Sequence, residues 1–95
     1  MTRLAVDVVK RSGSRPSESF DADKLLRSIQ AACLSVRSPE GQAESTATNV
    51  TNAVILWLDT KPVVTSHDIR RLASAHLHRH HPDAAYLYQH HRIII

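Results

Sequence analysis

From residue 22 to the end of the chain, apolar residues recur at intervals of three and four positions, which is the spacing of one face of an α-helix. Pro and Gly residues divide this region into four segments, for which we predict helices at about residues 22–37, 40–59, 67–80 and 83–95. The chain has one Trp, two Tyr and one Phe, so its core must consist mainly of Leu, Ile, Val and Ala. Such a core favours helix packed on helix.

The first twenty residues follow a different pattern. Leu4, Val6 and Val8 alternate with smaller or polar neighbours, which indicates a short strand. A loop with Gly and Pro follows, and residues 18–20 return as a second strand, so residues of about 4–20 are predicted to form a β-hairpin. A length of 95 residues fits one domain. The predicted architecture is therefore a single, mostly helical α+β domain over residues 1–95, with a short N-terminal β-hairpin packed on a four-helix bundle.

Polar residues mark where two of the helices are expected to begin. Asp21 is the expected N-cap of the first helix, because its carboxylate can accept hydrogen bonds from free backbone N–H groups. Before the third helix, Thr65 and Ser66 are both suitable, and Ser66 is the expected cap. Pro82 suits the first position of the fourth helix.

Basic residues gather around the predicted hairpin. The formal net charge is +3 and the isoelectric point is near 9.5, which favours an anionic partner. Lys10 and Arg11 end the first strand, and Lys24 lies in the first turn of the helix that follows. Three cations beside a helix N-terminus suit a polyphosphate, which Arg11 can bind with two parallel hydrogen bonds.

Neighbouring residues extend this pattern toward a nucleotide. Val8 offers an apolar surface to a base, and Glu18 or Asp21 can accept hydrogen bonds from a sugar hydroxyl or a base amine. An alternative without a ligand stays open, in which the basic residues at the end of the strand are solvated and Asp21 is only a helix cap. The sequence contains neither a Walker loop nor a GxGxxG motif.

The order of these residues resembles the ATP-cone family. Residues 8–13, VVKRSG, and residues 18–25, ESFDADKL, are similar to the two halves of its signature. Residues 66–69, SHDI, and 85–88, AYLY, fit the third and fourth helices of the family. Two departures are Ser12, where Asp or Asn is usual, and a longer loop between the two halves. The resemblance extends from about Leu4 to Arg92.

This resemblance implies a regulatory module, found in ribonucleotide reductases and in the bacterial repressor of their genes, that binds ATP or dATP and changes oligomeric state. Mg²⁺ is expected on the phosphates, with no metal ligand from the protein. The implied contacts are Val8 with the base, Lys10, Arg11 and Lys24 with the phosphates, Glu18 and Asp21 with the base or ribose, Ser66 near the base, and Arg92 as the basic residue of the last helix.

The His and Cys residues do not indicate an enzyme. His76 and His80 are four positions apart, a spacing that lets two imidazoles share a metal, but no Cys or clearly placed carboxylate completes the set. Cys33 falls on the apolar stripe of the first helix and is expected in the core rather than as a nucleophile. The chain has neither a reductase barrel nor the zinc ribbon of the repressor. We expect a regulatory domain without catalytic residues.

Location and partners follow from the same observations. No apolar run approaches the roughly 18 residues of a membrane span, no secretory leader is evident, and the single Cys suits the cytoplasm. The expected partners are an adenine nucleotide, a second copy of the chain, and a separate ribonucleotide reductase or transcriptional regulator. Two alternatives stay open: a basic accessory domain that binds nucleic acid, which is disfavoured because the basic residues are dispersed, and a degenerate cone that no longer binds nucleotide.

Overall fold

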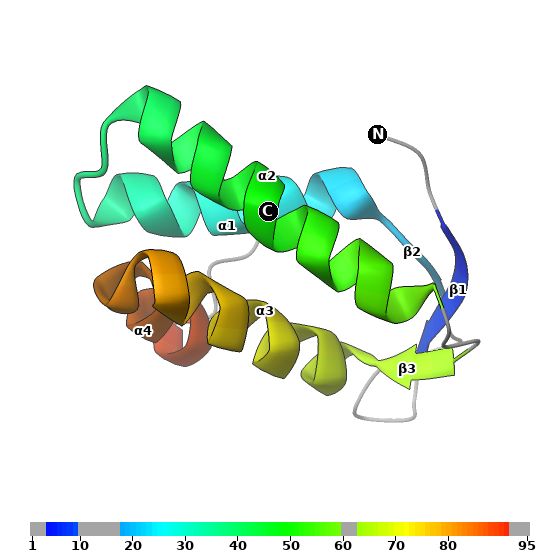
Figure 1. Cartoon of the computed structure of the whole chain (residues 1–95). Coiled ribbons are helices and arrows are strands. Elements are labelled where there is room, and N and C mark those ends of the chain that lie inside the picture. The colour runs from blue at the N-terminus through cyan, green and yellow to red at the C-terminus, as the bar shows by residue number, and fades with distance from the viewer. Residues whose placement is uncertain (1–3, 10–17, 60–62, 92–95) are drawn as a thin grey trace.

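A computed structural model describes residues 4–9, 18–59 and 63–91, with side-chain environments for residues 20–59 and 63–90. These residues form four helices and three short strands, which confirms the mostly helical α+β class (Figure 1). In chain order the elements are β1 (Leu4–Val9), β2 (Glu18–Phe20), α1 (Ala22–Ser35), α2 (Glu40–Leu58), β3 (Val63–Thr65), α3 (Ser66–His80) and α4 (Pro82–His91).

The strands form one small sheet in the order β2-β1-β3. β1 pairs antiparallel with β2, and the register shifts between Leu4 and Asp7. β1 also pairs in parallel with β3, a strand that the sequence analysis did not predict. β3 has three residues, too few to show an alternating pattern, and unlike β2 it does not follow a neighbouring strand through a turn with Gly and Pro. The turn of the predicted hairpin lies outside the described residues.

Local interactions fix both ends of α1. The Asp21 carboxylate caps the helix as predicted, because its Oδ1 accepts hydrogen bonds from the backbone N–H groups of Asp23, at 3.1 Å, and Lys24, at 3.3 Å. At the other end Arg37 adopts a left-handed conformation with φ of 64°. This conformation ends α1 at Ser35 rather than at the predicted residue 37.

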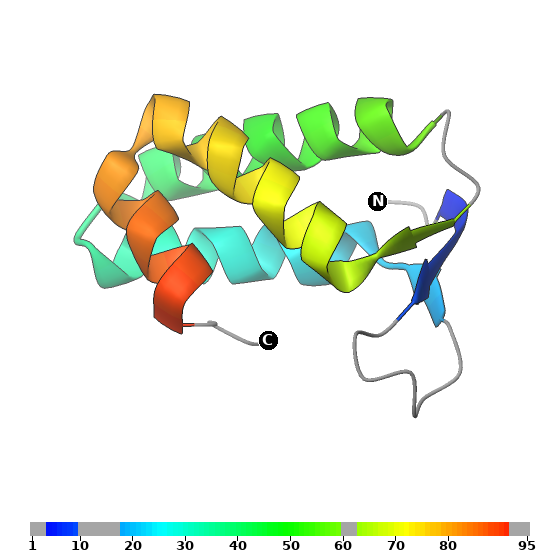
Figure 2. The ribbon, with the colours of Figure 1, turned by 90° about the horizontal axis from the view of Figure 1, so that it is seen from below.

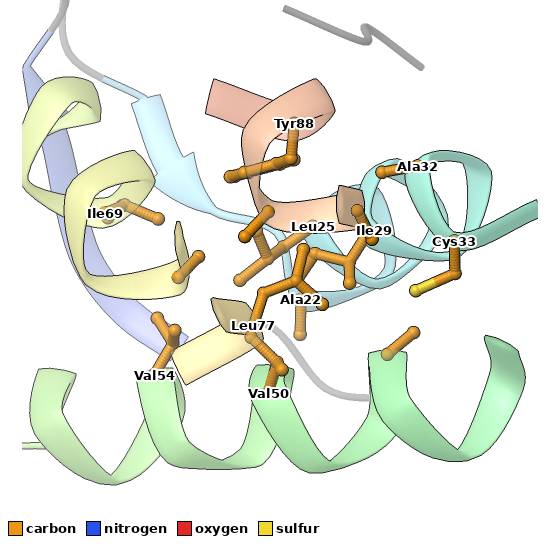
Figure 3. Close-up of a cluster of buried hydrophobic side chains, with 14 of the residues drawn as sticks. Ala22, Leu25, Ile29, Ala32, Cys33, Val50, Val54, Ile69, Leu77 and Tyr88 are labelled. Atoms are coloured by element: carbon orange, nitrogen blue, oxygen red, sulfur yellow. The ribbon is translucent and has the colours of Figure 1, made fainter. Parts of the chain in front are cut away.

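The core lies between the four helices and is mainly aliphatic, as the sequence predicts. Figure 3 shows Ile29 of α1, Val50 and Val54 of α2, Leu77 of α3 and Tyr88 of α4 pointing toward one another. Ile29, Val50, Val54 and Leu77 are fully buried. Removal of this apolar surface from water is the main stabilising contribution to such a fold.

α3 and α4 are joined through a sharp corner and one long side chain. His81 is the C-cap residue after α3, and its Nδ1 accepts a hydrogen bond from the Ala84 N–H of α4 at 3.4 Å. Arg70 donates from Nη1 to the Tyr88 carbonyl oxygen at 3.2 Å, and its guanidinium lies 5.2 Å from the centre of the Tyr88 ring. Burial raises the pKa of the Tyr88 hydroxyl. α4 was predicted for residues 83–95, of which 92–95 lie outside the described residues.

The sheet lies at the end of the molecule where α1 and α3 begin (Figure 2). The corner between α3 and α4 lies at the opposite end, beside the connection between α1 and α2 (Figures 1 and 2). Within the part of the chain that the structure describes, no helix has both the length and the apolar character needed to cross a membrane.

Candidate functional site

Two helices begin directly after strands of the same sheet. β2 ends at Phe20 and is followed by the N-cap of α1, whereas β3 ends at Thr65 and is followed at once by α3. Both helix N-termini therefore lie at the sheet end of the molecule (Figures 1 and 2). Free N–H groups and the helix dipole make such ends favourable for negative charge.

The register of β1 brings together positions that are far apart in the sequence. Val8 is the pairing partner of Glu18 on one side and of Val64 on the other. The next residue, Val9, pairs with Thr65, which immediately precedes Ser66. The sheet thus aligns three segments of the predicted site, and β3 provides the connection to α3 that sequence reasoning missed.

The N-terminus of α1 holds two of the predicted residues. Asp21 is half-buried, and the hydrogen bonds of its Oδ1 are directed at its own helix. Lys24 is exposed in the first turn of the same helix. The arrangement places an exposed ammonium group one turn after a capping carboxylate.

The N-terminus of α3 differs from the prediction. Thr65, not Ser66, is the N-cap: its hydroxyl oxygen accepts a hydrogen bond from the Asp68 N–H at 3.0 Å, and the Thr65 N–H donates to Asp68 Oδ2 at 3.2 Å. The hydrogen bond that the Thr65 backbone N–H donates to the carboxylate, with a smaller contribution from the Thr65 side chain, holds the pKa of the Asp68 carboxyl below its usual value. Ser66 is instead the half-buried first residue of α3.

The capping box could have been found from the sequence, since Thr65 and Asp68 have the spacing of that motif. The preference for Ser66 placed the start of the helix one residue too late. Asp68 also forms a salt bridge with Arg71, whose Nη2 lies 3.4 Å from Asp68 Oδ1.

Three of the predicted contact residues, Lys10, Arg11 and Arg92, lie outside the described residues. Val8 and Glu18 are described through their backbone pairing. Lys10 and Arg11 follow β1 directly in the sequence, so their predicted role in binding phosphates stays a prediction.

Two further kinds of site, a histidine metal centre and a reactive thiol, concern the His and Cys side chains. Among residues 20–59 and 63–90, no group of three or more His, Cys, Asp or Glu side chains is placed to hold a metal ion. Cys33 lies in the core with 1% of its surface exposed, as predicted, and burial raises the pKa of its thiol. A raised pKa lowers the thiolate fraction and with it the nucleophilicity of the side chain.

Comparison with known proteins assigns the chain to a family. The family model described as the ATP cone domain matches residues 6–92. Two similar curated proteins are named transcriptional repressor NrdR, from Thermosynechococcus vestitus and Microcystis aeruginosa, and each is 35% identical over 84 residues, or 88% of this chain. Those residues make up 49% and 46% of the two repressors, so the chain spans about half the length of the curated relatives it matches.

No solved structure matches the chain with significance. The family model nevertheless covers nearly all of it, including β2, β3, the four helices as far as they are described, and most of β1. The residues that carried the resemblance, VVKRSG and ESFDADKL, lie inside the matched range. On these grounds the chain belongs to the ATP cone domain family.

Proposed function

We propose that this chain is a regulatory domain that binds ATP or dATP at the sheet end of the molecule and responds by self-association or by docking on a separate protein. The observation that supports it most directly is the register of β1, in which Val8 pairs with both Glu18 and Val64, next to the start of α3. Membership of the ATP cone domain family supports the nucleotide itself.

In this proposal, different elements at the sheet end of the molecule contact different parts of the nucleotide. Residues of β1 and β2, the N-cap of α1 and the start of α3 contact the base and ribose. Basic side chains contact the phosphates, because phosphate oxygens prefer Arg and Lys as partners. The base and ribose residues are Val8, Glu18, Asp21 and Ser66, and the phosphate residues are Lys10, Arg11 and Lys24, with Arg92 as a further cation. Lys24 fits this role because it is exposed in the first turn of α1.

Mg²⁺ in this proposal is bound through the nucleotide. Magnesium prefers oxygen ligands and commonly keeps waters while it binds one or two carboxylates or the phosphates of a substrate. The side chains of the described residues form no acidic cluster suited to a metal, so phosphate oxygens are the natural ligands.

The proposed role is regulatory and non-catalytic. Both curated relatives are named as transcriptional repressors, which supports a regulatory role for the segment they share with this chain. A nucleotide shifts an equilibrium between two oligomeric or docked states only by its difference in affinity for them, and about 1.4 kcal/mol gives a tenfold shift. The proposed partner is a second copy, a ribonucleotide reductase or a transcriptional regulator.

Isothermal titration of the purified chain with ATP and dATP in Mg²⁺, combined with light scattering, tests the proposal. We expect saturable binding and a change in mass. Lys24→Ala should weaken nucleotide binding about tenfold, because it removes one charge-assisted contact to phosphate. Arg79→Ala is the matched control, since Arg79 is an exposed cation near the C-terminal end of α3 and should leave binding unchanged.

Two results would contradict the proposal. Absence of heat and of a mass change at millimolar nucleotide would refute the proposed function and leave the family assignment intact. Equal affinities in the Lys24→Ala and Arg79→Ala variants would refute the assigned site. Titration with a duplex oligonucleotide at two salt concentrations separates the alternative role, because binding to a nucleic-acid backbone weakens steeply as salt rises.

A further inference from the structure

A groove lies between α3 and α4, away from the strands. Its volume is about 580 Å³, and the side chains that line it include Arg71, Ser74 and His78 of α3 and Asp83, Tyr86 and His90 of α4. This volume falls in the range of sites that bind small molecules. None of these residues belongs to the nucleotide site proposed above.

Ser74 contributes a buried polar group to the wall of this groove. The side chain is 6% exposed, and its hydroxyl has no hydrogen-bond partner. A buried hydroxyl without a partner destabilises the protein, because the group has lost water and gained nothing in return. Because Ser74 is one of the residues that line the groove, a ligand bound there is the partner that we consider for this hydroxyl.

Arg71 brings a positive charge and hydrogen-bond donors to the groove. The side chain of Arg71 is 68% exposed and interacts with Asp68 over 3.4 Å, an exposed pair of the kind that contributes little energy. A guanidinium has five N–H donors, so Arg71 has others to offer a ligand. His78 and His90 add imidazole groups, and Asp83 is the one acidic residue among those that line the groove.

An aromatic pair forms one side of the groove. The rings of Tyr86 and His90 lie 4.4 Å apart between centres at an interplanar angle of 40°. Tyr86 is 62% exposed. Together with the apolar surfaces of Ala75, Pro82 and Ala85, this pair offers a surface on which a flat ring can pack.

We propose that the groove between α3 and α4 is a second ligand site, for a small molecule with one flat ring and one anionic group. The ring packs against Tyr86 and His90, and the anionic group accepts hydrogen bonds from Arg71 and from the Ser74 hydroxyl. A carboxylate and a phosphate both meet these requirements, and the test below distinguishes them.

Nuclear magnetic resonance of the ¹⁵N-labelled chain tests this site directly. Benzoate and phenyl phosphate supply the ring with an anion, and benzyl alcohol supplies the ring alone. We expect saturable amide shifts at residues 71–78 and 83–90 with an anionic probe, and at least tenfold weaker binding of benzyl alcohol. Tighter binding of benzoate identifies a carboxylate ligand and tighter binding of phenyl phosphate a phosphate ligand, and either result supports the site.

Two arginine variants test the anionic contact. Arg71→Gln should weaken binding of the anionic probe at least fivefold. Arg79→Gln makes the same change on the same helix at an exposed residue that does not line the groove, and it should have no effect. Equal affinity of Arg71→Gln and the unmodified chain would overturn the proposal.

A pair of hydroxyl variants separates ligand binding from stability. Thr51 has the same buried, unpartnered hydroxyl as Ser74 but lies in α2, outside the groove. Ser74→Ala and Thr51→Val should both raise the melting temperature without ligand. Only Ser74→Ala should weaken probe binding. The proposal is wrong if neither anionic probe shifts the groove amides at about 10 mM, where even millimolar affinity is detectable, or if the shifts fall only at the sheet end.

Discussion

Thr65 decides where α3 begins, because it shares two hydrogen bonds with Asp68. Thr65→Ala should lower the free energy of unfolding by about 1 kcal/mol, the usual contribution of an N-cap side chain. Ser66→Ala should lower it much less, since Ser66 is inside the helix. Urea denaturation of both variants measures the difference, and a larger loss for Ser66→Ala would contradict the cap assignment.

The same capping box makes the stability of the folded chain depend on pH. The pKa of Asp68 is lowered in the folded chain from a usual value of 3.8, mainly by hydrogen bonds from Thr65. The carboxylate therefore stabilises the fold fully above pH of about 4, and this contribution is lost as the pH falls through the lower folded pKa. Asp68→Asn should be less stable than the unmodified chain at pH 7, with the gap closing below pH 4. Urea titrations at a series of pH values test it, and a gap that does not narrow as the pH falls would show that charge is not the cause.

Single residues were predicted best where the sequence offers one candidate for the position. Asp21 as a cap and Cys33 as a core residue follow from their positions before and within an apolar stripe. The choice between Thr65 and Ser66 could not be made from propensity, since both cap helices well, and it depended on the partner three residues later.

The connection between α1 and α2 shows how an element can end without glycine. The Ser38 N–H donates to the Cys33 carbonyl oxygen at 3.1 Å, and the Arg37 N–H donates to the Leu34 carbonyl oxygen at 3.0 Å. This is a Schellman motif with Arg37 in the left-handed position that glycine usually occupies.

Arg37→Gly should therefore stabilise the chain, by about 1 kcal/mol, because glycine adopts positive φ without a steric cost. Thermal denaturation provides the measurement, and Ser35→Gly, which places glycine inside the last turn of α1, is the opposite control. A loss of stability in Arg37→Gly would mean that the arginine side chain contributes more than its backbone strain costs.

Elements were predictable where a local pattern or a nearby turn indicated them: the three-residue β2 was predicted because it follows β1 after a loop with Gly and Pro. The four helices carry several turns of apolar periodicity, whereas β3 has three residues and pairs with β1, which lies more than fifty residues earlier in the sequence. Its pairing with β1 is a property of tertiary structure that no local pattern contains.

β3 connects the sheet end of the molecule, where the candidate nucleotide site lies, to α3. Val64 is buried at 5% exposure and pairs with Val8. Val64→Ala and Val50→Ala should each cost about 2 kcal/mol of stability, because both remove buried methyl groups. Only Val64→Ala should also weaken nucleotide binding, since Val50 lies within the helix bundle. Titration of both variants with nucleotide, below the melting temperature of each, tests this. Equal nucleotide affinities of the two variants would show that the sheet does not position the site.

The central place of β1 in the sheet has a consequence for how the chain folds. β1 precedes the other described elements in the chain, yet one of its two partners, β3, follows α1 and α2. Pairing of such distant segments requires closure of a long loop, and contacts of this kind form slowly. We expect the helices to assemble first and the parallel pairing of β1 to complete the fold. The proposed nucleotide site would then be among the last parts of the molecule to form.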